Sequence, residues 1–208
     1  MKYFLEACCT SLEAVRAAEA MGTRRIELCE QLEIGGVTPS EALMREVLSS
    51  TRLPVNVLVR PRGGGFVYTE AEIQTMLSSI YVCKRLGVNG VVIGALTPDG
   101  EVDLPLMRRL MAEAKGLSVT FHRAFDESVD PFAALEDIIS LGCHRLLTSG
   151  HAPDAYAGRE MLGRLVQAAR GRIVILAGCG VRPGNIDTIA DASGASEYHS
   201  SFISTDWP

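Results

Sequence analysis

The chain has 208 residues, of which 47% are hydrophobic and 22% charged, and its formal net charge is −5. The apolar content excludes an intrinsically disordered chain, and the negative charge argues against a general nucleic-acid-binding protein. Glu6 interrupts the first apolar run, so no secretory signal is expected, and no stretch reaches the ~18 apolar residues of a membrane span. We expect one cytoplasmic domain over residues 1–208, with neither nucleic acid nor a membrane as partner.

Eight short apolar runs follow one another along the chain. Several are rich in Val, Ile and Leu, as are strands that are buried on both faces of a parallel sheet. The runs cover residues 3–8, 25–29, 54–59, 90–93, 118–122, 145–148, 173–177 and 196–200.

Seven amphipathic segments separate these runs and predict helices. Thr10 or Ser11 is placed to cap the first helix, and Asp130-Pro131 is a typical start for the fifth. Glycines end four of the helices, each two or three residues before an even-numbered strand, which indicates a βαβα repeat. These glycines are Gly22, Gly87, Gly142 and Gly194.

This order of elements predicts an α/β fold of the TIM (β/α)8-barrel type. An open doubly wound sheet is the alternative, but no Gly-x-Gly-x-x-Gly fingerprint follows the first strand. Because Thr205-Asp206-Trp207-Pro208 comes directly after the eighth strand, we expect the eighth helix to be short or missing.

Alternation along each strand predicts which side chains point into the barrel. Val55, Val57 and Val59 must face the helices, so their neighbours face inward. The same reasoning on the other strands yields a charged interior of Glu6, Arg25, Glu27, Arg60, His122, Glu197 and His199. Buried charges must pair or line a solvated pocket. Barrel active sites lie at the carboxyl ends of the strands, which favours a pocket there over an Arg–Glu network that only fixes register.

Glycine-rich loops and arginines follow several strands. Glycine lets backbone amides approach an anion, and the guanidinium fork binds phosphate or carboxylate. The loops after the seventh and eighth strands often bind phosphate in this fold. The candidate anion-binding residues are Arg60, Arg62, Ser149, Gly178, Gly180 and Arg182.

Histidine chemistry centres on His122, which follows the fifth strand and precedes Arg123 and Asp126. Such a histidine can act as a general acid or base oriented by a carboxylate, or it can be a structural residue held by hydrogen bonds. His144 and His151 have no such context and are expected at the surface.

The six cysteines include no Cys-x-x-Cys pair. Cys8 and Cys29 end the first two strands with the same inward parity, and adjacent strands lie ~4.8 Å apart. Two thiols at one height can share a soft ion, and without a nearby histidine they suit Cu(I) better than tetrahedral zinc. Cys179 approaches the same end of the barrel from the seventh strand, whereas Cys83 and Cys143 are expected in the core.

Several motifs, kept in order along the chain, resemble the CutC family of copper homeostasis proteins. They are Glu6-Ala-Cys8, Arg25-Ile-Glu-Leu-Cys29, Gly35-Gly-Val-Thr-Pro-Ser40, Arg60-Pro-Arg-Gly-Gly64, Leu96-Thr-Pro-Asp-Gly100, Thr120-Phe-His-Arg-Ala-Phe-Asp126 and Leu147-Thr-Ser-Gly150. The resemblance implies a TIM barrel, a cytosolic location, a homo-oligomer (a dimer or larger) and Cu(I) binding at Cys8 and Cys29. Cys179, a candidate third ligand, stands where the family pattern resembles Gly-Gly-Gly.

Two functions remain open at this point. The family resemblance favours Cu(I) handling through the cysteine thiolates. The alternative is an enzyme for a small anionic metabolite, phosphorylated or not, in which Arg60 and Arg62 bind the anion and His122 moves a proton with Glu6 or Glu27. Neither function calls for a nucleotide cofactor, and the sequence does not decide whether the protein is an enzyme. A purely structural homo-oligomer would leave the charged interior unexplained.

Overall fold

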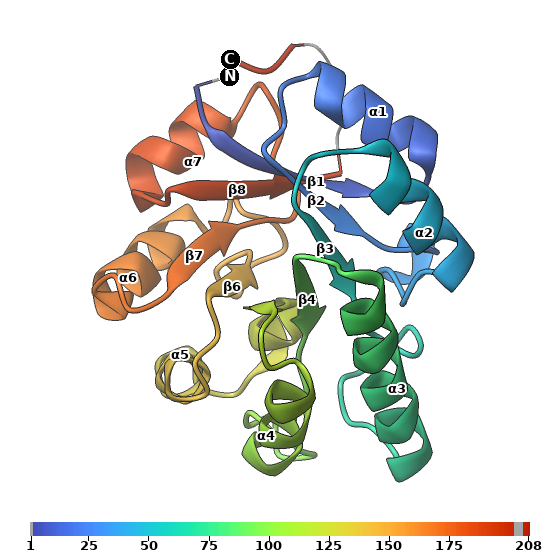
Figure 1. Cartoon of the computed structure of the whole chain (residues 1–208). Helices are drawn as coiled ribbons and strands as arrows, with labels where there is room; N and C mark the ends of the chain where they lie inside the picture. Colours follow the sequence, from blue (N-terminus) through green and yellow to red (C-terminus); the bar gives the residue numbers. More distant parts are fainter. Residues whose placement is uncertain (1, 202–205) are drawn as a thin grey trace.

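Parallel strands close into a barrel in the computed structural model, which describes residues 2–201 and 206–208 (Figure 1). Each strand pairs with the next along the chain, and the last pairs with the first. The strands are β1 (Phe4–Cys9), β2 (Arg25–Leu28), β3 (Val55–Leu58), β4 (Gly90–Ile93), β5 (Ser118–Phe121), β6 (Arg145–Thr148), β7 (Val174–Ala177) and β8 (Glu197–Ser200). The TIM-barrel prediction is confirmed, and the doubly wound alternative is excluded.

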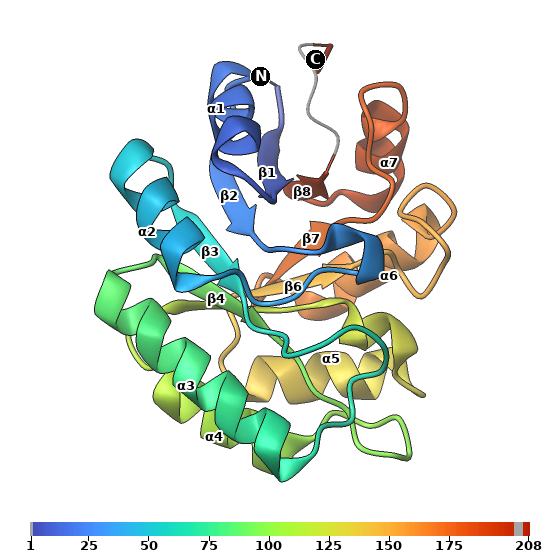
Figure 2. The same ribbon diagram turned by 90° about the vertical axis from the view of Figure 1, so that its right-hand side faces the viewer.

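The α-helices lie outside the strands in both ribbon views (Figure 1, Figure 2). They are α1 (Leu12–Ala20), α2 (Glu41–Ser50), α3 (Glu70–Leu86), α4 (Leu104–Glu113), α5 (Pro131–Ser140), α6 (Arg159–Ala169) and α7 (Ile186–Ser193). Two short 3-10 helices, Leu32–Ile34 and Arg123–Glu127, lie in the loops after β2 and β5. The prediction that the eighth helix is short or missing falls partly on residues 202–205, which lie outside the described residues.

Local signals in the sequence set the helix ends. The Ser11 hydroxyl accepts a hydrogen bond from the Ala14 amide, and the Asp130 carboxylate accepts bonds from the first turn of α5. Gly87 and Gly194 end α3 and α7 with φ of 76° and 64°, a left-handed conformation that glycine adopts without strain.

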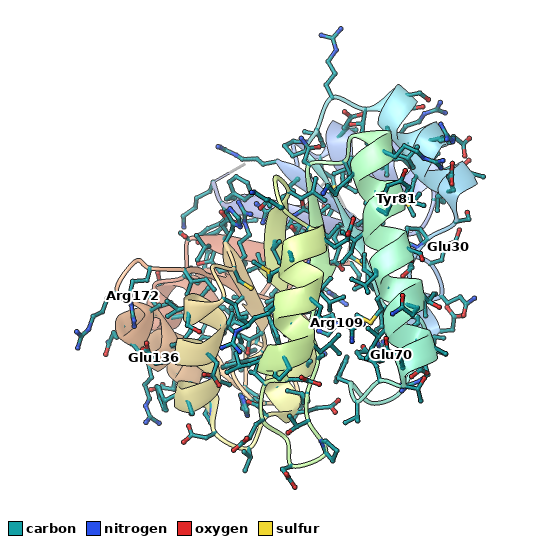
Figure 3. All side chains as sticks on the ribbon, turned by 60° about the horizontal axis from the view of Figure 1, so that its bottom comes forward. Glu30, Glu70, Tyr81, Arg109, Glu136 and Arg172 are labelled. Carbon is teal, nitrogen blue, oxygen red and sulfur yellow. The ribbon has the colours of Figure 1, made fainter. Side chains whose placement is uncertain are left out.

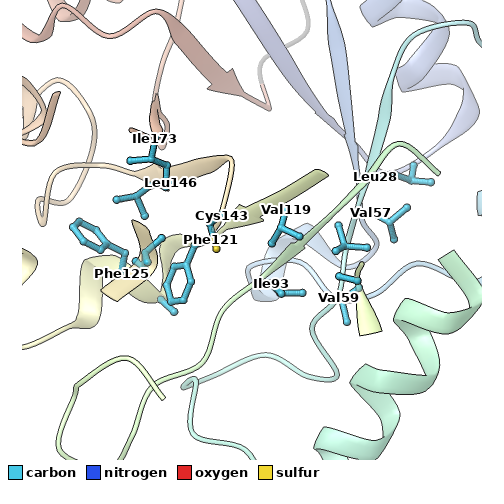
Figure 4. Close-up of a cluster of buried hydrophobic side chains, with 14 of the residues drawn as sticks. Leu28, Val57, Val59, Ile93, Val119, Phe121, Phe125, Cys143, Leu146 and Ile173 are labelled. Atoms are coloured by element: carbon cyan, nitrogen blue, oxygen red, sulfur yellow. The ribbon is translucent and has the colours of Figure 1, made fainter. Parts of the chain in front are cut away.

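The main hydrophobic core lies between the strands and the helices. Val57 of β3, Val59 in the loop directly after β3 and Ile93 of β4 all belong to this core (Figure 4). Leu58 belongs instead to a separate apolar cluster with Cys8, Cys29 and Val92. This separation confirms the predicted alternation, because neighbouring residues of one strand contact different clusters.

Ion pairs link neighbouring helices on the outer surface. Arg109 on α4 binds Glu70 on α3, and Arg172 binds Glu136 on α5 (Figure 3). The chain ends meet on the same side of the barrel, where the Lys2 amide donates to the Pro208 carbonyl (Figure 1). Among the described residues, no helix combines the length and apolar character that crossing a membrane requires.

Candidate functional site

A layer of ion pairs fills the amino-terminal part of the barrel interior. The register places Glu6 of β1 beside Arg25 of β2 and beside His199 of β8. Arg25 donates to Glu6 through Nε and to Glu197 through Nη2, and the Arg145 Nε donates to Glu197 at 2.9 Å. We call Glu6, Arg25, Arg145 and Glu197 the paired layer. Strand alternation predicted the inward position of Glu6, Arg25 and Glu197, whereas Arg145 was not among the predicted inward charges.

Glu6 connects the paired layer to the residues above it. The His199 Nδ1 lies 2.8 Å from Glu6 Oε1 and 4.0 Å from Glu27 Oε2. Burial alone would raise the pKa of Glu6, but the bond to His199 and the charge of Arg25 lower it to about 2. Burial would lower the pKa of His199, but Glu27 and Glu6 raise it to about 8. Burial raises the pKa of Glu27 to about 7.

A cavity of about 630 Å³ opens above these residues at the carboxyl ends of the strands. One side of it, which we call the thiol wall, is formed by Cys8, Cys29, Glu27 and His199. The Sγ atoms of Cys8 and Cys29 are 3.5 Å apart. Ligand atoms of Cys8, Glu27 and His199 lie within 4.8 Å of one another. The expectation that no histidine lies near the thiols was therefore wrong for Cys8, and the three residues of this group offer the sulfur, oxygen and nitrogen donors that zinc also binds.

The thiol wall keeps Cys8 protonated in the absence of a metal. The contact with Cys29, together with burial, raises the pKa of Cys8 well above its usual range. Cys9, the next residue of β1, faces the opposite way and packs in the main core, and burial raises its pKa to about 12. A bound metal would have to displace the proton of Cys8, as soft metals do when they bind thiols.

The other side of the cavity includes Arg60, Phe66 and His122, which we call the imidazole wall. The Arg60 guanidinium carbon lies 4.9 Å from the centre of the Phe66 ring, and the rings of Phe66 and His122 are 4.9 Å apart. Burial, with the charge of Arg60, lowers the pKa of His122 to about 3. His122 is therefore neutral at physiological pH.

The second predicted arginine, Arg62, lies outside the cavity. Its Nε donates to Glu72 at 2.5 Å, and its Nη atoms donate to the carbonyls of Gly63, Gly65 and Val67. Gly64 likewise accepts from Arg60 through its carbonyl. This glycine-rich loop thus turns carbonyl oxygens toward its arginines, where the sequence argument had expected amides turned toward an anion.

The remaining predicted anion-binding residues lie around β6 to β8, and only some of them reach the cavity. Ser149 is buried; its amide donates to Asp126, and its hydroxyl donates to the Ala152 carbonyl. Arg182 donates to the Val181 carbonyl and contacts the Ser200 hydroxyl. Gly178 packs closely against Leu147, since a Cβ at this position would lie 2.4 Å from Leu147 Cδ1. Gly180 lines the cavity.

Cys179 lines the cavity as well, in a left-handed conformation with φ of 73°. Its Sγ donates to the Pro153 carbonyl at 3.3 Å. Cys179 is not a member of the group formed by Cys8, Glu27 and His199.

His151 corrects a prediction, since it lines the cavity rather than lying simply at the surface. Its ring packs edge-on against Phe125, and its amide donates to Asp126. Its position after a Ser-Gly turn at the carboxyl end of β6 was the available signal. His144 is exposed as expected, and its Nδ1 accepts from the Val119 amide.

Comparisons with known proteins agree with this architecture. The chain is 52% identical over 202 residues to a protein of Parabacteroides distasonis that carries the name CutC, covering 97% of this chain and 83% of the relative. A relative of that name from Xylella fastidiosa is 47% identical, over 95% of this chain and 74% of its own length. A solved CutC structure from Streptococcus agalactiae, named for copper homeostasis, superposes with a TM-score of 0.91 at 30% identity, covering 97% of this chain and all of the other. The family model of CutC matches residues 3–204, and the chain therefore belongs to the CutC family.

Proposed function

We propose that this protein handles copper in the cytosol by binding Cu(I) between the thiolates of Cys8 and Cys29. The observation that carries the proposal is the 3.5 Å separation of the two Sγ atoms at the wall of the cavity. Thiolates are the ligands that Cu(I) prefers, and two sulfurs with few competitors suit its low coordination number. The copper-homeostasis name of the related Streptococcus agalactiae structure supports the choice of metal.

His199 adds a nitrogen donor close to Cys8, in a group that includes Glu27 but not Cys29. Its Nδ1 faces Glu6, which leaves Nε2 as the nitrogen available to a metal. A carboxylate that holds the other imidazole nitrogen is a usual companion of a metal-binding histidine, because it fixes the ring orientation. Glu27 offers a hard oxygen ligand and matters less to Cu(I) than to zinc.

An anaerobic competition titration tests this proposal. Wild-type protein and the Cys8→Ala/Cys29→Ala variant are titrated with Cu(I) against a chromophoric chelator, and Zn²⁺ is titrated in parallel. We expect one tight Cu(I) site in the wild type and its loss in the variant. Cys9→Ala is the matched control, because Cys9 is a buried thiol of the same strand on the opposite face. Equal Cu(I) binding in all three proteins, or tight binding of zinc alone, would overturn the proposal.

Self-association is part of the same proposal. Leu32, Ile34 and Val67 are exposed apolar side chains in loops after β2 and β3. Apolar side chains grouped on a surface are typical of contact sites between proteins. Light scattering coupled to size-exclusion chromatography is expected to give a dimer or a larger species, and a monomer at micromolar concentration would contradict it.

A second candidate function is that of an acid–base enzyme. The grouping of Glu6, His199 and Glu27 at the base of the cavity favours it. The same imidazole nitrogen, Nδ1, lies 2.8 Å from Glu6 Oε1 and 4.0 Å from Glu27 Oε2. Such an array can hold and move a proton beside a bound metabolite. Exchange of carbon-bound hydrogen of small keto acids with deuterated solvent, followed by NMR, tests this function. It predicts exchange that Glu27→Gln abolishes.

A further inference from the structure

Arg60 is a buried cation without an anionic partner in the part of the chain that the structure describes. Its guanidinium donates to the carbonyls of Ile34, Gly36 and Gly64, and only 6% of the residue is exposed. Across residues 2–201 and 206–208, no carboxylate forms an ion pair with it. Carbonyl dipoles satisfy hydrogen bonds but leave a net positive charge at the wall of the cavity. An anion in the cavity would compensate that charge.

His122 presents a hydrogen-bond donor beside this cation. Its Nδ1 accepts the Ala124 amide at 3.2 Å, so the single proton of the neutral ring sits on Nε2. That Nε2 is buried and has no partner among the residues that the structure describes. Gly94 leaves room for the ring, because a Cβ at this position would lie 2.6 Å from the Nδ1. The imidazole is therefore a fixed donor, in contrast to the proton carrier that the sequence suggested.

Phe66 separates the cation from the donor and supplies an apolar surface. Its ring lies 4.9 Å from both the Arg60 guanidinium carbon and the centre of the His122 ring. A ligand that reaches both polar groups must place its carbon atoms near this ring. Small-molecule sites commonly combine an apolar surface with a few fixed polar groups in this way.

We propose that the imidazole wall binds a small organic acid, whose carboxylate lies beside Arg60 and whose second oxygen accepts the hydrogen bond of His122 Nε2–H. A phosphate dianion fits less well, because it calls for several donors and the neighbouring glycine loop presents carbonyls. The proposal goes beyond copper binding. It also names a substrate class for the second candidate function, the acid–base enzyme. Binding of the organic acid does not depend on that function.

Binding of keto acids to the metal-free protein tests this proposal. The probes are pyruvate, acetoacetate and 4-oxopentanoate, which differ in the spacing between carboxylate and ketone, with inorganic phosphate for comparison. Calorimetry measures affinity, and NMR of ¹⁵N-labelled imidazoles follows His122 Nε2. We expect saturable binding of at least one keto acid, with a shift of the His122 Nε2 resonance and weaker binding of phosphate.

Variants separate the two groups. His122→Phe keeps a ring and removes the donor, and Arg60→Met removes the charge. Each is expected to weaken keto-acid binding by about tenfold or more, the loss that follows when a hydrogen bond to a charged ligand is removed. His122→Gln retains an N–H donor and should recover part of the affinity. Arg109→Gln removes a surface guanidinium from α4 and is the control for net charge.

Two results would overturn the proposal. One is the absence of saturable binding for every keto acid in the wild type. The other is binding that is equal in wild type and His122→Phe. If Arg60→Met fails to fold, the wild-type NMR titration decides, because an unchanged His122 Nε2 resonance at saturation excludes contact with the ligand. Since no metal is present and no turnover is measured, these outcomes are independent of copper binding and of acid–base catalysis.

Discussion

Two layers of charged side chains occupy the barrel, and they differ in how fully their polar atoms are bonded. In the paired layer, Arg25 joins Glu6 and Glu197, and Arg145 shares Glu197. Around the cavity above it, Glu27 Oε2 and His122 Nε2 lack hydrogen-bond partners among the described residues. Both expectations for the charged interior thus apply, each to a different height in the barrel.

The difference separates stability from binding. A buried polar atom without a partner costs stability, and a fold retains such atoms where a ligand can satisfy them. The paired layer has little left to offer a ligand, because its charges already bind one another. Substitutions in the two layers should therefore have opposite effects on stability.

The largest effect is expected from Arg25→Met in the paired layer. The substitution leaves Glu6 and Glu197 without their shared cation, and removal of one partner from a buried ion pair typically costs ~3–5 kcal/mol. Urea denaturation measures the free energy of unfolding. Arg145→Met is the matched control with a smaller loss, because Arg145 is more exposed and Glu197 keeps Arg25. If Arg25→Met lowered the free energy of unfolding by less than ~1 kcal/mol, the ion pairs of the paired layer would not contribute to stability as described.

An opposite, pH-dependent effect is expected from Glu27→Gln. Burial raises the pKa of Glu27 from 4.5 to about 7, so folding favours the protonated form. Its contribution to stability therefore falls as the pH rises from 4.5 through 7. Glutamine removes this loss and should raise the free energy of unfolding at pH 8 by roughly 1–3 kcal/mol. Urea denaturation at pH 8 and pH 4.5 checks the prediction. The gain should nearly vanish at the lower pH, and an equal gain at both values would contradict it.

The smallest effect is expected from Cys179→Gly. Cys179 has φ of 73°, a conformation that costs an L-residue roughly 1–2 kcal/mol. Glycine relieves that strain but loses more chain entropy on folding, so a net stabilisation of about 0.5 kcal/mol is expected. Thermal unfolding measures it, with Gly180→Ala as the opposite control, because a Cβ at Gly180 would lie 3.1 Å from Asp154. Cu(I) affinity should change less than about threefold. A large loss of affinity would make Cys179 a third ligand.

Much of the fold could be predicted because its signals are local. Each β run is short and bounded by turn residues, and the helix caps at Ser11 and Asp130 act on amides within three residues. The alternation that buries Val55 and Val57 also turns Asn56 inward, so the composition of the barrel interior followed from strand periodicity. The motifs along the chain resemble those of the CutC family, to which the chain belongs.

The candidate site was less predictable, because loops after the strands decide it. Arg60 and Arg62 belong to the same Arg-Pro-Arg motif, and the sequence does not distinguish them. Arg60 lines the cavity, whereas Arg62 binds Glu72 in the first turn of α3. His151 faces the cavity because the loop after β6 folds onto Asp126. Neither outcome follows from periodicity, which applies only within regular elements.

The sequence by itself determined the barrel, the inward charges other than Arg145 and the pair of cysteines at adjacent strand ends, since all three follow from local periodicity and strand order. Tertiary structure alone decided that His199 joins Cys8 and Glu27, because closure of β8 onto β1 brings together residues from opposite ends of the chain. It also decided that, among the residues described, Arg60 has no counter-charge and His122 Nε2 has no hydrogen-bond acceptor. Those properties depend on which neighbours surround a side chain in space.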